Sequence, residues 1–436
     1  MAETLLKSSG SISESLPVSA HAKKLWAIAA LAFLVRLAAG LWTGGLWHPE
    51  LWEYDQIAKS LLAGRGFSLP HLMITYYSYV TPLHSWATAA GYWLTGSNVA
   101  LMLVQMAAGA ALAVVVACIS QRIFGGWMAG AIAGILIAIH PGFVLYNSTK
   151  AHSLAFDSLF FALALLQSFR LAERPTLRRF LIFGLIIGVG TLSRGTMLIM
   201  GPLGGLWVLA RSPRGARTVL FRNLVLAGLL AAIIIAPWTI RNSLIHHRLV
   251  LLISTESEDF WLGNNPRATG HTLIDSEHTV FMSLPPDERD DLYRQPNEMA
   301  QADWFSQRSR AFVREHPGEF FRLWALKFFH FWWYAPQTGA RYPGSWFYLY
   351  MIFYAAMLAL AALGLIRIVQ LGPPATHMGW LVGIFLVGLS LLQSVYHVDG
   401  RHRWGIEPIL LALSSGGAAF LLERFLRRKS RTATIS

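Results

Sequence analysis

Apolar segments of bilayer-spanning length recur along this chain of 436 residues. A membrane-spanning helix takes about 20 consecutive apolar residues, and lipid offers no hydrogen-bond partners to an irregular backbone. Segments that wholly or partly meet this description are 25–42, 98–120, 127–145, 153–169, 180–210, 223–237, 346–366, 379–396 and 404–422. The sequence therefore predicts an all-α polytopic membrane protein with about 10–12 transmembrane helices.

The composition supports this fold class. Hydrophobic residues make up 54% of the chain and charged residues 14%. Soluble domains average roughly 45–50% apolar and about 25% charged residues, so the composition excludes an ordinary soluble enzyme and a disordered protein. The single cysteine, Cys118, excludes an intrachain disulfide and a cysteine-based metal site.

Three segments leave the helix count open. The run 180–210 is interrupted by polar residues at 191–195, which predicts two short helices that meet near the outer face. Segments 80–94 and 321–334 are apolar but short, and each carries polar residues. Both fit either a crossing or an interfacial helix, because Trp and Tyr concentrate where lipid meets water.

The net charge of +13 is unevenly distributed. Basic residues cluster before residue 25, in 170–179, in 211–222 and after residue 423, and the positive-inside rule places these clusters in the cytoplasm. The stretch 238–320 instead holds 13 of the 23 acidic residues, which predicts a small folded domain on the outer face. Basic residues interleaved with aromatics on a soluble surface do not occur, so we expect no nucleic-acid partner.

This pattern divides the chain into five parts, and the lipid bilayer is a partner of most of it. The parts are a cytoplasmic N-terminal tail (1–24), a transmembrane body (25–237) with a first outer loop (44–79), an outer-face soluble domain (238–320), C-terminal transmembrane helices (321–423) and a basic cytoplasmic tail (424–436). Candidates for chemistry therefore lie at the outer ends of helices.

Acidic residues gather in the first outer loop. If Pro49 opens a helix, Glu50, Glu53 and Tyr54 fall on one face of it, at positions i, i+3 and i+4. A carboxylate at a helix start on the lipid boundary suits a general base. The same carboxylate also fits a purely structural role, in which it complements the helix dipole.

Asp157 is the only acid inside the apolar body apart from the segment ends. An ionisable residue within a membrane segment marks a functional site by default. Lys150 and His152 precede Asp157 at the outer end of the same predicted helix. Asp157 fits either a structural pair with one of these two residues or a role in orienting the acceptor or the base.

Several strings resemble the glycosyltransferase C superfamily, in particular its bacterial branch similar to protein O-mannosyltransferases and the lipid A aminoarabinose transferase. The resemblance is colinear over nearly 360 residues. It rests on Glu-Leu-Trp-Glu-Tyr-Asp-Gln-Ile-Ala at 50–58 with Gly-Arg-Gly-Phe at 64–67, Thr-Pro-Leu at 81–83, Ala-Pro-Trp-Thr-Ile-Arg-Asn at 236–242, Gly-Asn-Asn-Pro at 263–266, and Arg-His-Arg-Trp at 401–404 with Pro408.

The resemblance implies an integral membrane glycosyltransferase of a bacterial inner (plasma) membrane. Such enzymes move a sugar from a polyprenyl-phosphate donor to a hydroxyl of a lipid, glycan or protein acceptor, with the active site facing the periplasm or exterior. The resemblance assigns the general base of an inverting reaction to Glu50 within the catalytic body 25–237. The family more often has Asp at this position, and Glu53 and Asp55 remain alternatives.

The same resemblance calls for cationic groups at the donor phosphate and for polar groups at the substrates. Arginine suits phosphate because it donates two parallel hydrogen bonds, although each candidate also fits an interfacial anchor. The phosphate candidates are Arg401, Arg403, Arg194 and Arg241. The substrate-binding candidates are Tyr54, Lys150, His152, Lys327, His330 and Asn264, of which Lys327 and His330 also fit simple packing in an aromatic run.

We predict no cofactor and favour a metal-independent reaction. A divalent metal remains possible because Glu53-Tyr54-Asp55 is a Glu-x-Asp variant of the acidic motif of distant superfamily members. No His-x-x-x-His or Asp-x-Asp string occurs.

Two other classes of function compete with the glycosyltransferase. A transporter or flippase of a lipid-linked sugar would explain the helices and the interrupted run 180–210. It also predicts internal inverted repeats, which the sequence does not display, and it leaves 238–320 without a role. A membrane scaffold would suit the 17 Trp and 25 Phe residues, but it does not predict acids gathered before Tyr54.

Overall fold

The structure, a computed structural model, describes residues 18–275, 278–335, 337–338 and 344–433. The helices are α1 (Val18–Thr43), α2 (Glu53–Leu62), α3 (Pro82–Thr95), α4 (Val99–Phe124), α5 (Trp127–Ile139), α6 (Pro141–Thr149), α7 (Leu154–Glu173), α8 (Leu177–Ser193), α9 (Met200–Arg211), α10 (Arg217–His246), α11 (Glu256–Gly263), α12 (Pro286–Tyr293), α13 (Glu298–Glu315), α14 (Pro317–Trp332), α15 (Gly344–Leu371), α16 (Ala375–Gln393), α17 (Gly400–Arg403) and α18 (Glu407–Ala433). The strands β1 (Leu69–His71) and β2 (Ile74–Tyr76) form an antiparallel hairpin in which Leu69 pairs with Tyr76. Short 3-10 helices lie at Gly195–Ile199, Arg214–Ala216 and Phe281–Ser283.

The predicted all-α polytopic class is confirmed, with a lower helix count than the 10–12 expected from sequence. Among the described residues, seven helices are long and apolar enough to cross a membrane, or eight if the bent pair α5 and α6 is one span. The apolar segments at α3, α8, α9 and α14 form helices of 14, 17, 12 and 16 residues. These fall short of the length of about 20 residues that a crossing needs.

The predicted interruption of the run 180–210 is confirmed. α8 ends at Ser193, and Arg194 adopts an extended conformation before the 3-10 turn that leads into α9. Another break was not foreseen, because 127–145 was expected to be one segment. α5 and α6 meet there at an angle of 46°, since Pro141 cannot donate the backbone hydrogen bond that a continuous helix requires.

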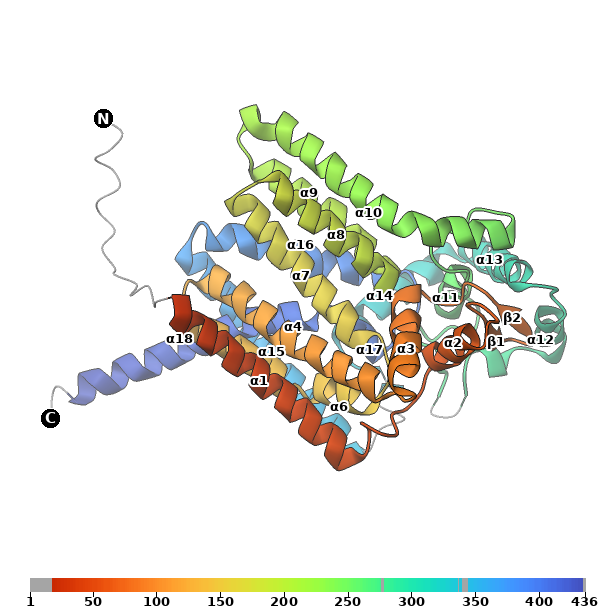
Figure 1. The fold of residues 1–436 in the computed structure, drawn as a ribbon, viewed down its shortest axis with the longest axis horizontal. Coiled ribbons are helices and arrows are strands. Elements are labelled where there is room, and N and C mark those ends of the chain that lie inside the picture. The colour runs from red at the N-terminus through yellow and green to blue at the C-terminus, as the bar shows by residue number, and fades with distance from the viewer. Residues whose placement is uncertain (1–17, 276–277, 336, 339–343, 434–436) are drawn as a thin grey trace.

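Figure 1 shows the helices running across the view, with two ends of different character. The first loop with α2, β1 and β2 gathers with α11, α12 and α13 at one end, which we call the loop end. The start of α1, the connection from α9 to α10 and the end of α18 lie away from it, and with them the basic clusters of the chain. Lys7 and the side chain of Arg431, which belong to these clusters, lie outside the described part.

Packing of α15 against α18 depends on small residues. A Cβ atom on Gly364 would overlap the carbonyl oxygen of Leu413, and one on Gly417 would overlap the carbonyl oxygen of Leu360. Each helix therefore presents a glycine to the backbone of the other, as is common where membrane helices approach closely. This contact fixes the position of α18 and hence of α17, which directly precedes it.

We expect Gly364→Val to destabilise the protein by about 3 kcal/mol or more, because the added side chain meets backbone that cannot move aside. The measurement is thermal unfolding of the purified protein in detergent. Gly383→Val on α16 is the matched control, since nothing lies within 4 Å of a Cβ atom there. Equal unfolding temperatures for the two variants would contradict the close α15–α18 contact.

Candidate active site

A cavity of about 500 Å³ lies beside α17, and we call it the Arg401 cavity. Its charged lining residues are Glu50, Lys150, Asp399, Arg401 and Arg403. A second part of its wall is aromatic and is formed by Trp52, Tyr146, Tyr334, Trp346, Phe347, Tyr350 and Trp404. One cavity thus combines three cations, two carboxylates and an aromatic wall.

Glu50 reaches this cavity from an extended segment and not from a helix. The main-chain N–H of Glu50 donates to the Thr149 carbonyl (2.7 Å), and Ala151 N–H donates to the Glu50 carbonyl (3.0 Å). The predicted helix face of Glu50, Glu53 and Tyr54 is therefore wrong, because α2 begins only at Glu53. The Glu50 carboxylate is 55% exposed and accepts a hydrogen bond from the Lys150 ammonium.

The two alternative acids of the first loop do not line the Arg401 cavity. Burial raises the pKa of Glu53 above its ordinary value of 4.5, and the nearby Arg401 opposes that effect. Asp55 lies deeper and is already paired, because it accepts from the Tyr92 hydroxyl and forms an ion pair with Lys59 (2.8 Å). The geometry therefore favours Glu50 over Asp55 as a reactive carboxylate.

Asp157 and Tyr54 belong to a buried polar network whose residues do not line the cavity. Asp157 is 1% exposed and accepts hydrogen bonds from the hydroxyls of Ser153 (2.9 Å) and Ser193 (2.6 Å). Arg194 completes the network with an ion pair to Asp157 (3.6 Å), and Tyr54 contacts Ser153 through its hydroxyl (3.2 Å). Asp157 thus pairs with Arg194, and not with Lys150 or His152 as one expectation from sequence proposed.

His152 supports the cavity wall. Its Nδ1 accepts from the main-chain N–H of Leu154 (3.1 Å), and its ring packs edge-on against Trp52 and Tyr146 at centroid distances of 5.1 and 5.6 Å. Burial lowers the pKa of His152 well below 6.5, so the ring is neutral. Lys150 reaches the same aromatic pair, 6.0 Å from the Trp52 ring and 5.2 Å from the Tyr146 ring.

The two arginines of the Arg-His-Arg string differ in how tightly the fold holds them. Arg401 lies 3.5 Å from Asp399 and 4.8 Å from the Trp52 ring, and its side chain is 29% exposed. Arg403 is 2% exposed and donates to Glu407 (3.3 Å) and to the Tyr350 hydroxyl (3.0 Å). Arg401 therefore has the more accessible guanidinium.

The other two predicted phosphate ligands are not among the residues that line the cavity. Arg194 is paired with Asp157, as described above. Arg241 holds the first loop in place, because it donates to the carbonyls of Tyr77 and Phe67 (3.1 Å to Phe67) and lies 4.7 Å from the Trp238 ring.

Lys327 and Asn264 join three segments near the loop end. The Lys327 ammonium donates to the Gly263 carbonyl (3.0 Å), Asn264 Oδ1 (2.8 Å) and the Val395 carbonyl (3.2 Å). Burial lowers the pKa of Lys327 to about 7, whereas three oxygen acceptors match the three donors of its ammonium form. His330 makes a separate contact, with its Nδ1 3.0 Å from Nε2 of the cavity residue His271.

We expect Lys327→Met to destabilise the protein by about 3 kcal/mol, because it removes a donor from three buried oxygens. Thermal unfolding in detergent measures this loss. Lys59→Met is the matched control, since Lys59 is 56% exposed and its removal should cost less than about 1 kcal/mol. An unchanged unfolding temperature for Lys327→Met would contradict this structural role.

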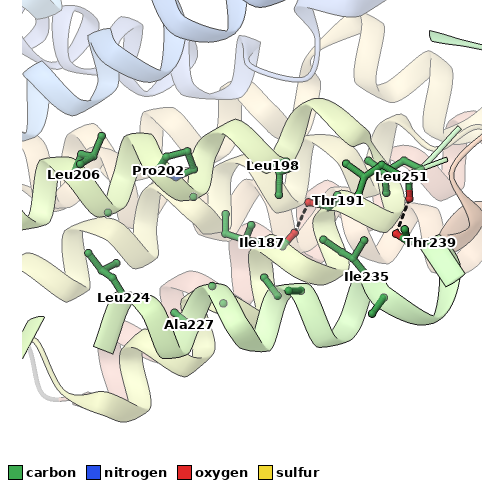
Figure 2. Close-up of a pocket in the computed structure, with 18 of the residues that line it drawn as sticks. Ile187, Thr191, Leu198, Pro202, Leu206, Leu224, Ala227, Ile235, Thr239 and Leu251 are labelled. Atoms are coloured by element: carbon green, nitrogen blue, oxygen red, sulfur yellow. Dashed lines mark hydrogen bonds between the residues drawn. The ribbon is translucent and has the colours of Figure 1, made fainter. Parts of the chain in front are cut away.

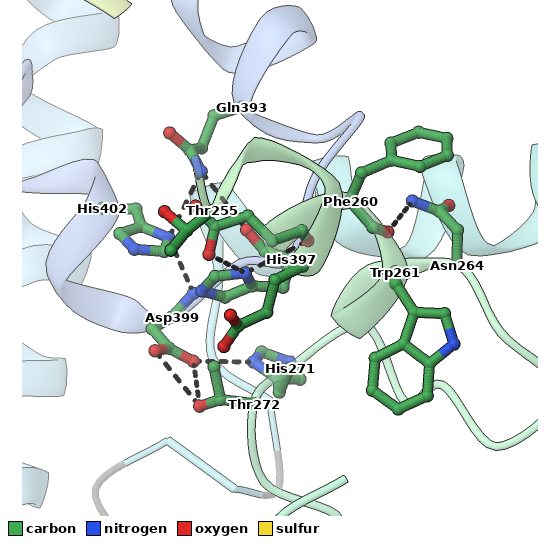
Figure 3. A network of polar contacts seen from close by, with 12 residues as sticks. Thr255, Phe260, Trp261, Asn264, His271, Thr272, Gln393, His397, Asp399 and His402 are labelled. Carbon is green, nitrogen blue, oxygen red and sulfur yellow. Dashed lines mark hydrogen bonds and ion pairs between the residues drawn. The ribbon is translucent and has the colours of Figure 1, made fainter. Parts of the chain in front are cut away.

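One cluster at the cavity was not selected from the sequence. Figure 3 shows His397, Asp399 and His402 close together, with His271 and Thr272 next to Asp399. The signal was the spacing His-x-Asp-x-x-His at 397–402, which overlaps the Arg-His-Arg string. Partial burial raises the pKa of the neighbouring Asp259 to about 6, and the adjacent His397 opposes this shift.

A second cavity, of about 650 Å³, lies between α8, α9 and α10. Figure 2 shows its wall of apolar side chains, including Ile187, Leu198, Pro202 and Leu206. None of the described residues that line it carries a charge. We call it the apolar cavity, and the described residues that line it offer no cationic partner for a phosphate.

Part of the sequence is similar to a family of known proteins. Residues 79–240 match the family model described as dolichyl-phosphate-mannose-protein mannosyltransferase. The match covers less than half of the chain, which is similar to this family over that part. The part matched to the mannosyltransferase model includes Lys150, His152, Asp157 and Arg194, whereas Glu50 precedes it and Arg401 follows it.

Two curated relatives share the name undecaprenyl phosphate-alpha-4-amino-4-deoxy-L-arabinose arabinosyl transferase. The one from Edwardsiella ictaluri is 26% identical over 54% of this chain and 41% of its own length. The one from Sodalis glossinidius is 27% identical over 53% of this chain and 39% of its own length. The matched part of the chain thus spans about two fifths of the length of these relatives.

A solved structure supports the fold. The archaeal oligosaccharyltransferase AglB from Archaeoglobus fulgidus superimposes with a TM-score of 0.52 at 14% identity. The superposition covers 95% of this chain and 52% of that protein. At this identity the likeness concerns the fold of the chain and not its activity.

Proposed function

We propose that the chain is an integral membrane glycosyltransferase that moves a sugar from a polyprenyl-phosphate donor to an acceptor hydroxyl, with the Arg401 cavity as the donor site. The observation that carries the proposal is the cavity lining, which brings Glu50, Lys150 and Arg401 next to an aromatic wall. The names of both curated relatives describe transfer of a sugar from undecaprenyl phosphate, which supports the same donor class.

The donor phosphate would lie between Arg401 and Lys150. Arginine offers two parallel N–H donors to phosphate oxygens, and lysine adds a point charge. Each cation has a carboxylate partner, Asp399 for Arg401 and Glu50 for Lys150. A bound phosphate would share these cations, and Arg403 would add positive potential from its buried position.

The isoprenoid chain would follow the aromatic wall towards the bilayer. Trp346 is 52% exposed and lies in the first turn of α15, one of the candidate membrane spans. Phe347 and Tyr350 continue the wall towards Arg403. A donor with a charged head and an apolar tail matches a cavity with the same polarity gradient.

Glu50 would act as general base. The acceptor oxygen forms its bond to the anomeric carbon while the bond from that carbon to the phosphate oxygen breaks, and the proton of the acceptor hydroxyl passes to the Glu50 carboxylate. The polyprenyl phosphate leaves with the electron pair, and attack from the opposite face inverts the anomeric configuration. Lys150 pairs with the Glu50 carboxylate before the step and would face the departing phosphate.

We further propose that the loop end faces the periplasm or exterior of a bacterial inner membrane. The basic clusters lie away from the loop end, and positive residues are retained on the cytoplasmic side. The acidic stretch 238–320 would then contact the acceptor, whether lipid, glycan or protein.

The experiment is a transfer assay with purified protein in lipid nanodiscs. A panel of polyprenyl-phosphate-linked sugars with a radiolabelled sugar is supplied together with a membrane-lipid, glycan or protein acceptor fraction. We expect release of free polyprenyl phosphate together with label in one acceptor fraction. Movement of intact donor across a liposome membrane with no bond cleavage would instead indicate a flippase and contradict the proposal.

A further inference from the structure

We infer that His397, Asp399 and His402 form a site for one divalent metal ion of the zinc type at the edge of the Arg401 cavity. Each of the three residues offers one ligand atom, and these atoms lie within 4.8 Å of one another. Two imidazoles and one carboxylate are a frequent ligand set for zinc and for iron(II), and both leave coordination positions open for another molecule. The sequence prediction favoured metal independence, and the motif that kept a metal ion open was Glu53-Tyr54-Asp55.

The backbone brings the three ligands together by a single turn. Asp399 is the N-cap of α17 and forms a capping box with His402, in which each side chain accepts from the main-chain N–H of the other. This places His402 back beside Asp399. His397 precedes the turn by two residues, and its ring centroid lies 5.1 Å from that of His402.

Groups from a distant part of the chain orient these ligands, as Figure 3 shows. His397 Nδ1 lies 3.4 Å from the Asp259 carbonyl and 3.7 Å from its carboxylate. A proton on Nδ1 would satisfy Asp259 and leave the Nε2 lone pair for an ion, the arrangement in which a carboxylate supports a metal-bound histidine. Thr272 donates its hydroxyl to both oxygens of Asp399 (3.2 and 3.3 Å).

His402 would exchange hydrogen bonds for a metal bond. Its Nδ1 accepts from the main-chain N–H of Asp399 (3.1 Å) and from the Gln393 amide (3.4 Å). A nitrogen that accepts hydrogen bonds is unprotonated, which is the form that a metal ion binds. Coordination through Nδ1 would displace these two donors.

The charges around Asp399 are compatible with a bound cation, although Arg401 lies nearby. Arg401 approaches Asp399 at Oδ2 (3.5 Å), whereas Oδ1 faces His271 at 4.0 Å. Oδ1 is therefore the oxygen that an ion would take. Asp259 adds a second carboxylate to offset the charge.

The location suggests the role of the ion, and this step rests on the proposed function. Asp399 and Arg401 line the cavity assigned to the donor phosphate. An ion held by three protein ligands could accept a phosphate oxygen in an open position and share the phosphate charge with Arg401. The ion would then strengthen donor binding and stabilise the departing polyprenyl phosphate.

The first test measures metal binding alone. The full-length protein is purified in detergent, stripped with a chelator and dialysed against zinc, and bound zinc is counted by mass spectrometry. We expect about one ion per chain and an absorption band between about 500 and 700 nm when cobalt(II) replaces zinc. His402→Gln and His397→Gln should each weaken zinc binding at least about tenfold. Asp259→Asn should weaken it about 10–100-fold, because it removes the carboxylate that supports His397.

His278→Gln is the matched control, because His278 is 60% exposed and pairs only locally with Asp275 in the contacts described for it. Zinc should raise the unfolding temperature of the wild type and of this control, but not that of His402→Gln. The presence of a cooperative unfolding transition shows that each variant is folded. Absence of bound zinc in the folded wild type, or equal zinc binding by His402→Gln, would overturn the site.

The second test separates the site from the proposed function. Binding of radiolabelled polyprenyl phosphate is compared between zinc-loaded and metal-free wild type. We expect at least about tenfold tighter binding with zinc. Stoichiometric zinc binding with no change in polyprenyl-phosphate affinity would overturn the placement of the ion at the donor, while sugar transfer by the metal-free protein would leave the proposed function intact.

Discussion

Glu50→Gln is expected to lower kcat for sugar transfer about 10²–10⁴-fold, because the amide cannot accept the proton of the acceptor hydroxyl. Donor binding should not weaken, since Lys150 loses its carboxylate partner and keeps its charge. The two effects are measured separately, as initial rates of label transfer under saturating donor and as binding of radiolabelled polyprenyl phosphate. Gln preserves the size of the side chain, so a folding defect is not expected.

Two further variants make this result specific. Glu319→Gln removes a carboxylate that is 41% exposed on α14 and paired with Arg322, and it should transfer sugar at the wild-type rate. Glu53→Gln removes the half-buried alternative acid of the first loop. Wild-type turnover by folded Glu50→Gln together with a collapse in Glu53→Gln would move the base to Glu53 and contradict the assignment.

Arg401→Ala is expected to weaken donor binding about 10–100-fold, because a hydrogen bond to a charged group contributes roughly 1.5–3 kcal/mol and each 1.4 kcal/mol is a factor of ten. Arg401→Lys should retain part of the affinity, since lysine keeps the charge but not the paired donors. The measurement is a titration with radiolabelled polyprenyl phosphate in nanodiscs.

The matched control is Arg322→Ala, which removes an arginine that is 61% exposed and remote from the cavity lining. It should bind the donor like the wild type. Arg241→Ala would probe a different effect, because Arg241 holds the first loop and its loss should lower the unfolding temperature. Equal donor affinity for Arg401→Ala and Arg322→Ala would exclude Arg401 as a phosphate ligand.

The membrane architecture could be derived from sequence because each spanning helix carries its own signal, a long apolar run. That signal gave wrong helix numbers or bounds where a proline interrupted an apolar run or where the run was too short to cross the membrane. Pro141 divides 127–145 into two helices, and α10 instead continues through Pro237 to His246, although the apolar run ends at 237. Hydrophobicity alone does not distinguish these two outcomes.

The site was foreseen in part. The acids before Tyr54 were recognised, but their helical phase was wrong, because Glu50 pairs with the backbone around Lys150 and α2 starts three residues later. A contact between residues 100 positions apart cannot be derived from local spacing. The same limit applies to the arginines. Arg401 lines the cavity and Arg241 holds the first loop, and this difference depends on burial and on partners distant in the sequence.

The histidine cluster was missed for a related reason. His402 lies between two arginines that the family resemblance marked for phosphate, and the overlapping spacing His-x-Asp-x-x-His at 397–402 was therefore not recognised. The common environment of these ligands depends on Asp259 and Thr272, which approach from more than 120 positions away. Only the folded chain brings these groups to one place.

The assignment of the donor site is tested most directly by the structure of the protein with a polyprenyl-phosphate-linked sugar bound, determined by electron cryo-microscopy in nanodiscs. We expect the phosphate next to Arg401 and Lys150, the isoprenoid chain along Trp346 and Phe347, and the anomeric carbon facing Glu50. A donor bound in the apolar cavity between α8, α9 and α10, with no contact to Arg401, would contradict the assignment.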